Sequence, residues 1–189
     1  GVQLPGRPEP VIIGNYAVDA NFFETMGIEL IAGRLFDENR PGDDATLPFP
    51  ATADQEQAIV ARGMTIVINE LAARRMGFAD PASAVGQTVM AGFFGPERGL
   101  VPTQIVGVVR DSRFRSIREP IDPIMFYQNR TFANTLLVRY DGADPQAAWN
   151  GVEAAWRRLA PDVPFDGEYS EARVAELYEA EEARAKTFA

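Results

Sequence analysis

Strand-forming and helix-forming segments alternate unevenly along this chain of 189 residues. Runs rich in β-branched and aromatic residues predict strands, and apolar residues at three- and four-residue spacing predict helices. The middle of the chain is rich in strands, whereas both ends mix strands with helices, and this order predicts an α+β fold. The expected strands are 11–18, 28–36, 65–68, 86–94, 104–109, 124–128, 135–140 and one near 165, and the expected helices are 20–26, 55–62, 70–76, 145–159 and 171–189.

Polar and glycine residues mark the expected ends of several helices. Asp19, Asn69 and Asp144 have side-chain oxygens that can accept hydrogen bonds from first-turn amides, so each predicts an N-cap. Gly27 and Gly77 follow the last apolar residue of their helices and predict the C-terminal ends, because glycine adopts the left-handed conformation without strain.

The helix expected over 145–159 carries one apolar stripe, formed by Trp149, Val152, Trp156 and Leu159. Such a stripe can line a ligand groove, but on an amphipathic helix it more often packs into a core. We therefore predict a core position, in which Trp156→Ala would cost about 3–5 kcal/mol of stability.

Composition excludes several classes of function. The chain has no cysteine and no histidine, which removes thiol chemistry, thiolate metal sites and the commonest general base and metal ligand near neutral pH. Lys186 is the only lysine and lies outside any glycine-rich turn, so a phosphate-binding loop of the Walker A type is absent. The net charge of −9 disfavours nucleic acid. We expect no enzyme activity, no cofactor and no metal.

The acid-rich segment 37–50 combines proline, glycine and aspartate, a composition typical of loops. It weakly resembles a calcium loop, but Pro41 and Pro48 stand where that loop needs ligands. We therefore expect a solvated, mobile loop.

One basic cluster follows the expected strand 104–109. Its four arginines could contact lipid head groups or an anionic partner, which makes them the tentative contact residues of the chain. The favoured alternative is an ordinary surface connection in which they pair with nearby acids such as Asp111 and Glu119. In either case Phe114 and Ile117, between the arginines, are expected to be partly buried. The cluster consists of Arg110, Arg113, Arg115 and Arg118.

Four stretches, in this order, resemble the periplasmic core domain of MacB-like ABC-transporter permease proteins, a group within the FtsX-like permease family. Each stretch alone is moderately specific, and the order of the four makes the resemblance stronger. They are FFETMGIELIAGRLF (22–36), VINELAARRMGFADPASAVGQTV (67–89), IVGVVRDSRFRSIREPIDPIMF (105–126) and DPQAAWNGVEAAWRRLAPDVPF (144–165).

The resemblance implies two lobes. A small porter-like sheet with packed helices would comprise residues 1–16 and 133–175, and a β-rich, sabre-like lobe inserted into it would comprise residues 17–132. Residues 176–189 would form a stalk helix that leads toward a membrane span, with residues 184–189 making few contacts.

The same resemblance implies an extracytoplasmic, periplasmic domain of a bacterial inner-membrane permease. Such a domain would couple ATP binding and hydrolysis by a cytoplasmic ATPase to conformational change outside the membrane, in export or lipoprotein-type transport. Its expected partners are the ABC ATPase, a second permease copy in the membrane, and a periplasmic adaptor or substrate. The alternative is a free-standing extracytoplasmic binding or sensing module.

Overall fold

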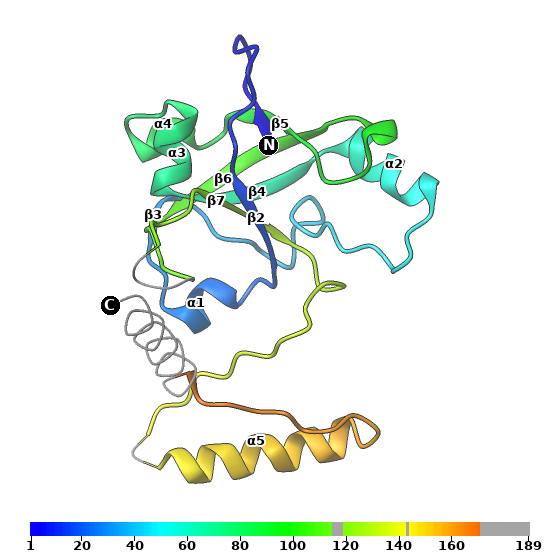
Figure 1. The fold of residues 1–189 in the computed structure, drawn as a ribbon, viewed down its shortest axis with the longest axis vertical. Coiled ribbons are helices and arrows are strands. Elements are labelled where there is room, and N and C mark those ends of the chain that lie inside the picture. The colour runs from blue at the N-terminus through cyan, green and yellow to red at the C-terminus, as the bar shows by residue number, and fades with distance from the viewer. Residues whose placement is uncertain (115–118, 143, 171–189) are drawn as a thin grey trace, which may run out of the picture. The chain divides into compact units, whose positions relative to one another are not determined.

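A computed structural model describes residues 1–114, 119–142 and 144–170 of the chain, which divides into two units, Gly1–Leu137 and Val138–Ala189 (Figure 1). Because the relative positions of the units are not determined, each unit is described by itself. Together they contain strands, short helices and one long helix, so the predicted α+β class is confirmed.

Unit 1 is built on a seven-stranded mixed sheet in the order β1-β5-β6-β4-β7-β2, with β3 also paired to β6. The central strand β6 pairs in parallel with β4 and antiparallel with β3 and β5, while the edge strand β2 runs parallel to β7. The strands are β1 (Val2–Gln3), β2 (Gly14–Val18), β3 (Leu30–Gly33), β4 (Met64–Asn69), β5 (Thr88–Ala91), β6 (Val101–Val109) and β7 (Ile124–Gln128).

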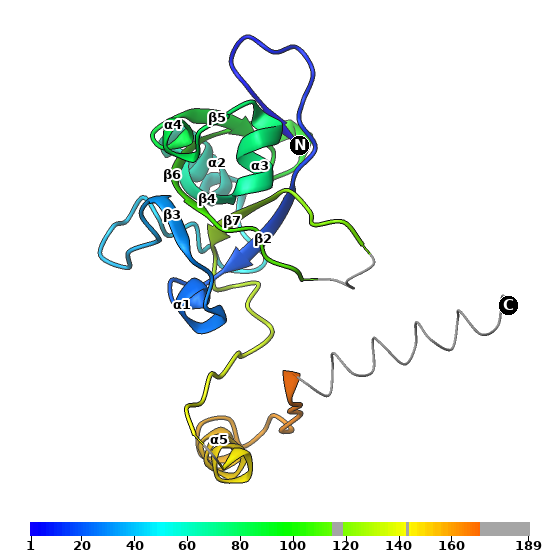
Figure 2. The same cartoon turned by 90° about the vertical axis from the view of Figure 1, so that its left-hand side faces the viewer.

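Two apolar cores lie on opposite faces of this sheet, and neighbouring residues of one strand feed both. Ile66 and Ile68 of β4 belong to the core under the helices α3 and α4, whereas Val67 belongs to the core that contains Phe23 of α1. This division follows from the alternation of side chains along a strand. Figures 1 and 2 accordingly show α3 and α4 on one side of the sheet and α1 on the other. The helices of unit 1 are α1 (Phe22–Met26), α2 (Ala53–Arg62), α3 (Glu70–Met76), α4 (Pro81–Ala84) and the 3-10 turn Pro96–Arg98.

The helix ends largely follow the sequence signals. Asn69 caps α3 by accepting a hydrogen bond from the Ala72 amide, and Gly27 and Gly77 end their helices in the left-handed conformation, as predicted. The prediction for Asp19 is wrong: Asn21 occupies the N-cap position of α1, and Asp19 instead accepts a hydrogen bond from the Asn21 amide in the preceding turn.

Strands β3 and β6 approach so closely that two positions admit only glycine. A Cβ atom on Gly33, whose φ is +76°, would lie 2.3 Å from the carbonyl oxygen of Val106, and one on Gly107 would lie 2.1 Å from that of Arg34. No side chain fits in that space, and the Arg34 amide that follows Gly33 still donates to the Val106 carbonyl oxygen at 2.9 Å.

Unit 2 contains α5 (Pro145–Leu159), with the predicted bounds and the predicted cap: Asp144 accepts a hydrogen bond of 3.0 Å from the Ala147 amide. The predicted strands at 135–140 and near 165 are wrong, because neither segment pairs with another described strand. The predicted helix 171–189, with its expected stalk and few-contact end, lies outside the described residues.

The division of the chain differs from the lobes expected from the resemblance. Residues 1–16 belong to unit 1, since β1 pairs with β5 and β2 pairs with β7 within its sheet. Unit 1 thus contains the whole of 17–132, and the boundary falls between Leu137 and Val138. In the described part of the chain, no helix combines the length and apolar character needed to cross a bilayer.

Candidate partner-contact surfaces

The predicted arginine cluster is only partly described. Arg110 is exposed, and its Nε lies 2.7 Å from the Oε2 of Glu29, which comes from a segment 81 residues earlier. The hydrogen bond from Arg110, together with its charge, lowers the pKa of Glu29 below its ordinary value. Arg110 is therefore held in an exposed ion pair, as the alternative of an ordinary surface connection predicts for it.

The connection after β6 is attached to α3 through Asp111. This carboxylate accepts hydrogen bonds from the Leu71 amide at 2.8 Å and from Arg74 at 2.7 Å. Arg113, farther along, donates to the carbonyl oxygen of Glu119 at 2.7 Å. The start of the connection is thus attached to α3 by contacts that are distant in the sequence.

Phe114 is partly buried against the core that contains Phe23, as predicted, whereas Ile117 lies outside the described residues. Arg115 and Arg118 also lie outside them, so the structure describes only Arg110 and Arg113 of the four arginines. A shallow depression under the connection is lined by Ser112, Arg113, Phe114 and parts of 119–124. Contact of this cluster with a lipid or a partner remains a prediction.

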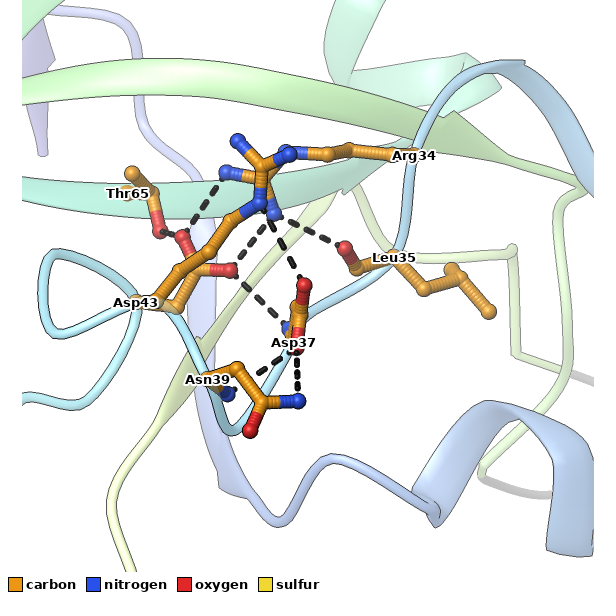
Figure 3. A network of polar contacts seen from close by, with 7 residues as sticks. Arg34, Leu35, Asp37, Asn39, Asp43 and Thr65 are labelled. Atoms are coloured by element: carbon orange, nitrogen blue, oxygen red, sulfur yellow. Dashed lines mark hydrogen bonds and ion pairs between the residues drawn. The ribbon is translucent and has the colours of Figure 1, made fainter.

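In the acid-rich segment, the buried carboxylate of Asp43 pairs with the partly exposed Arg34 (Figure 3). Asp43 is 1% exposed and receives two hydrogen bonds from Arg34, at 2.5 and 2.9 Å. Thr65 of β4 and the amide of Asp37 donate to the same carboxylate at 2.8 and 3.0 Å. Burial alone would raise the pKa of Asp43, but the hydrogen bonds from Arg34, Thr65 and Asp37 outweigh it and lower this pKa.

Two further arginines hold the same segment from other elements. Arg62, at the end of α2, donates to the carbonyl oxygens of Pro41 and Asp44 at 3.0 and 2.5 Å. Arg130, after β7, pairs with the Asp44 carboxylate at 3.0 Å, and its amide donates to Thr46. The prediction of a solvated loop is therefore wrong for its centre, where long-range contacts that leave no local sequence signal fix the chain.

Beyond this anchored stretch the segment presents an exposed aromatic pair. Phe49 and Phe132 are both exposed, with ring centroids 6.2 Å apart and planes inclined at 67°. The two loops that carry them are joined by hydrogen bonds from Ala45 to Gln128 and from Thr131 to Leu47. The pair is therefore held in place rather than left to move with a free loop, and sequence reasoning missed it.

Unit 2 exposes much of its apolar surface. Trp149 contacts Phe165 edge to face and Tyr169 in a tilted arrangement, with centroid distances of 5.3 and 5.2 Å. Trp156 donates from Nε1 to the Val163 carbonyl oxygen at 2.9 Å. No residue of α5 is buried. The prediction that its stripe lies in a core is wrong, because Trp149, Val152 and Trp156 are only half-buried and Leu159 is exposed. Among the described residues, the contacts of the two tryptophans come from the segment 163–169 that follows α5.

The displaced carboxyl groups among the described residues all shift in the same direction. Four carboxyl groups have clearly displaced pKa values, and all four are lowered: Glu29, Asp37, Asp43 and Asp44. A general acid at neutral pH needs the opposite shift. Within the part of the chain that the structure describes, no group of acidic side chains is arranged to hold a metal ion.

No protein-family model and no curated protein matches the chain. Among solved structures, the chain is similar to the periplasmic region of MacB from Actinobacillus actinomycetemcomitans, with 17% identity, a TM-score of 0.43 and coverage of 77% of this chain. The chain spans 56% of the length of that periplasmic region. It is also similar to a domain of a permease protein from Porphyromonas gingivalis, with 17% identity, a TM-score of 0.48 and coverage of 92% of this chain and 78% of that one. At this low identity, the chain is thus similar to the periplasmic region of MacB and to a domain of a permease protein.

Proposed function

We propose that this chain is the extracytoplasmic domain of a bacterial ABC-transporter permease of the MacB type. It relays conformational change between the membrane and the space outside it, driven by ATP binding and hydrolysis on a separate ATPase subunit or domain. In this role it makes and breaks no covalent bonds; its work is coupling between distant sites.

The proposal rests on the four stretches that resemble the MacB-like family and on the structural role of their residues. In the second stretch, Asn69 accepts hydrogen bonds from the Ala72 and Ile124 amides at 3.0 and 2.9 Å, which ties α3 to β7. In the first, Phe23 is fully buried. These residues fix the geometry of the sheet and helices, as expected of a module whose task is mechanical.

In this proposal, each of the two expected lobes corresponds to one of the two units. We assign the sabre-like lobe to unit 1 and the porter-like lobe to the part of unit 2 up to residue 175, with residues 176–189 as the stalk. A second permease copy and a periplasmic adaptor or substrate would complete the assembly. In this arrangement exposed apolar groups such as the Phe49–Phe132 pair are suited to partner contact, because aromatic anchors often dominate the energy of interfaces.

The test uses the full-length protein with its ATPase in lipid nanodiscs. Since residues 1–189 contain no cysteine, spin labels can be attached through Gln57→Cys on α2 and Ala154→Cys on α5, both exposed. We expect the distance distribution between these labels, one in each unit, to change between the nucleotide-free and ATP-trapped states. A second pair within unit 1, at Gln57 and Ala82, should not change.

Identical distributions for the Gln57–Ala154 pair in every nucleotide state would contradict the coupling role. The alternative function, a free-standing binding or sensing module, predicts that the native protein fractionates away from the membrane. That result would overturn the permease assignment.

A further inference from the structure

Asn150 and Gly151 form a chemically labile pair in the first half of α5. Asn150 is the only asparagine of the chain that is followed by glycine. In such a pair the glycine amide nitrogen can attack the asparagine side chain, because glycine has no side chain to hinder the approach and its backbone adopts many conformations. Among the asparagines of this chain, Asn150 is therefore the one most prone to spontaneous deamidation.

The reaction needs only water as a co-reactant. The Gly151 nitrogen forms a bond to Cγ of Asn150, the bond from Cγ to the side-chain nitrogen breaks, and ammonia leaves. Water then opens the resulting succinimide ring at either carbonyl carbon, which yields aspartate or isoaspartate. In isoaspartate the backbone runs through the side-chain carbon and is longer, so the regular hydrogen-bond pattern of an α-helix cannot continue through it.

The folded helix opposes this reaction. In the α-helical pattern the Gly151 amide donates to the Ala147 carbonyl oxygen, and it points along the helix axis, away from the Asn150 side chain. The Asn150 Oδ1 is also held by the Gln146 Nε2, which donates to it at 2.9 Å. Both restraints have to be released before the reacting nitrogen and carbon can meet.

Several features of α5 indicate that it opens readily. None of its residues is buried. Among the described residues, a Cβ atom on Gly151 would meet nothing within 4 Å outside the local helix backbone, so no packing contact requires a glycine there. Glycine inside a helix lowers the stability of that helix relative to alanine. Segments with few buried apolar contacts open locally at low free energy.

We propose that Asn150–Gly151 is a deamidation site of this chain and that the opening of α5 controls the rate of the reaction. Each conversion to isoaspartate would interrupt α5, so the site would limit the lifetime of unit 2. The inference does not rest on the proposed function, because the reaction needs only the helix and water.

Removal of the helix cap tests the proposal. The 189-residue chain, Asp144→Ala and Asp162→Ala are incubated in mildly alkaline buffer, and peptide mapping by mass spectrometry follows the conversion of every asparagine. Asp144→Ala removes the N-cap of α5 and should raise the deamidation rate at Asn150 about two- to fivefold. Asp162→Ala, the matched change at an exposed aspartate beyond the helix, should leave this rate unchanged.

Amide hydrogen exchange gives an independent measure of the opening. The exchange rate of the α5 amides, measured on the same samples, should change in proportion to the deamidation rate at Asn150, because both reactions proceed from the open helix. The chain denatured in urea should deamidate at Asn150 faster than any folded sample.

Three results would overturn the proposal. If Asn150 stays intact in the folded chain while the denatured chain converts, it is not a modification site of the native protein. If the folded and denatured chains convert at the same rate, α5 gives no protection. A rate that rises equally in Asp144→Ala and Asp162→Ala, or in neither, would show that opening of α5 does not control the reaction.

Discussion

Unit 1 and unit 2 use similar apolar patterns and bury them to different degrees. In unit 1, β4, β6 and β7 are covered on both faces, so Ile68, Val108 and Phe126 are almost fully buried. In unit 2, α5 has a well-formed apolar stripe, yet its residues are at most half-buried. The comparison shows that a local pattern defines an element, whereas burial depends on the layers that surround it. The following predictions test this difference, in order of decreasing effect.

Phe126→Ala should give the largest loss of stability. The ring is 1% exposed, and its centroid lies 5.1 Å from that of Phe23 and 6.1 Å from those of Tyr16 and Phe114. Removal of such a ring typically costs about 3–5 kcal/mol. Urea unfolding followed by far-UV circular dichroism gives this value, and a loss below about 1 kcal/mol would show that the core of unit 1 is not tightly packed.

Asn69→Ala should cost about 2–3 kcal/mol, because it removes an N-cap and leaves the buried Ile124 amide without its acceptor. The matched change in unit 2, Asp144→Ala, removes an exposed cap and should cost only about 0.5–1 kcal/mol. The same urea titrations measure both. Equal costs would mean that the two caps are equally embedded, against the contrast between the units.

Asp43→Asn should cost about 2 kcal/mol at neutral pH, a value reduced from that of a fully buried pair because Arg34 is partly exposed. Folding lowers the pKa of Asp43 below the ordinary 3.8, so its ionised form stabilises the fold above that pH. This contribution is lost as the pH falls through the folded-state pKa.

The urea midpoints of the wild type and Asp43→Asn should therefore converge as the pH falls below about 3.8. Glu38→Gln, an exposed change in the same segment, serves as the control and should leave the midpoint unchanged. A difference between wild type and Asp43→Asn that persists undiminished to the lowest pH at which the protein folds would refute the role of the charge.

Trp156→Ala should cost about 1–2 kcal/mol, less than the 3–5 kcal/mol of a core tryptophan, because its ring is only half-buried. Both tryptophans of the chain lie in α5, so their fluorescence reports on unit 2 alone. The emission of the native chain should lie between those of buried and solvated indoles. A fully blue-shifted spectrum in a dilute, monomeric sample would show that the stripe is buried after all.

Sequence reasoning succeeded where the signal is local. The bounds of α3 and α5 were predicted correctly, because Asn69 and Asp144 cap these helices and Gly77 ends α3. It missed the start of α2, although Thr52 and Gln55 form a capping box that the sequence displays. The failed strand at 135–140 shows the limit of local propensity, because a strand also needs a neighbour.

The contacts at the candidate surfaces could not be predicted from the sequence. Arg110 and Glu29 are 81 residues apart, and Arg130 and Asp44 are 86 residues apart. The excess of acidic residues predicts that arginines will form ion pairs. Which acid pairs with which arginine depends on the fold. For the same reason the acid-rich segment was expected to be mobile, although Arg34 holds its centre in place.

The alternation of side chains along β4 has a mechanical consequence. Because Ile66 and Val67 are successive residues of one backbone and belong to different cores, neither core can shift along the strand without carrying the other. A substitution that displaces the backbone at either residue is therefore expected to disturb the packing on both faces of the sheet.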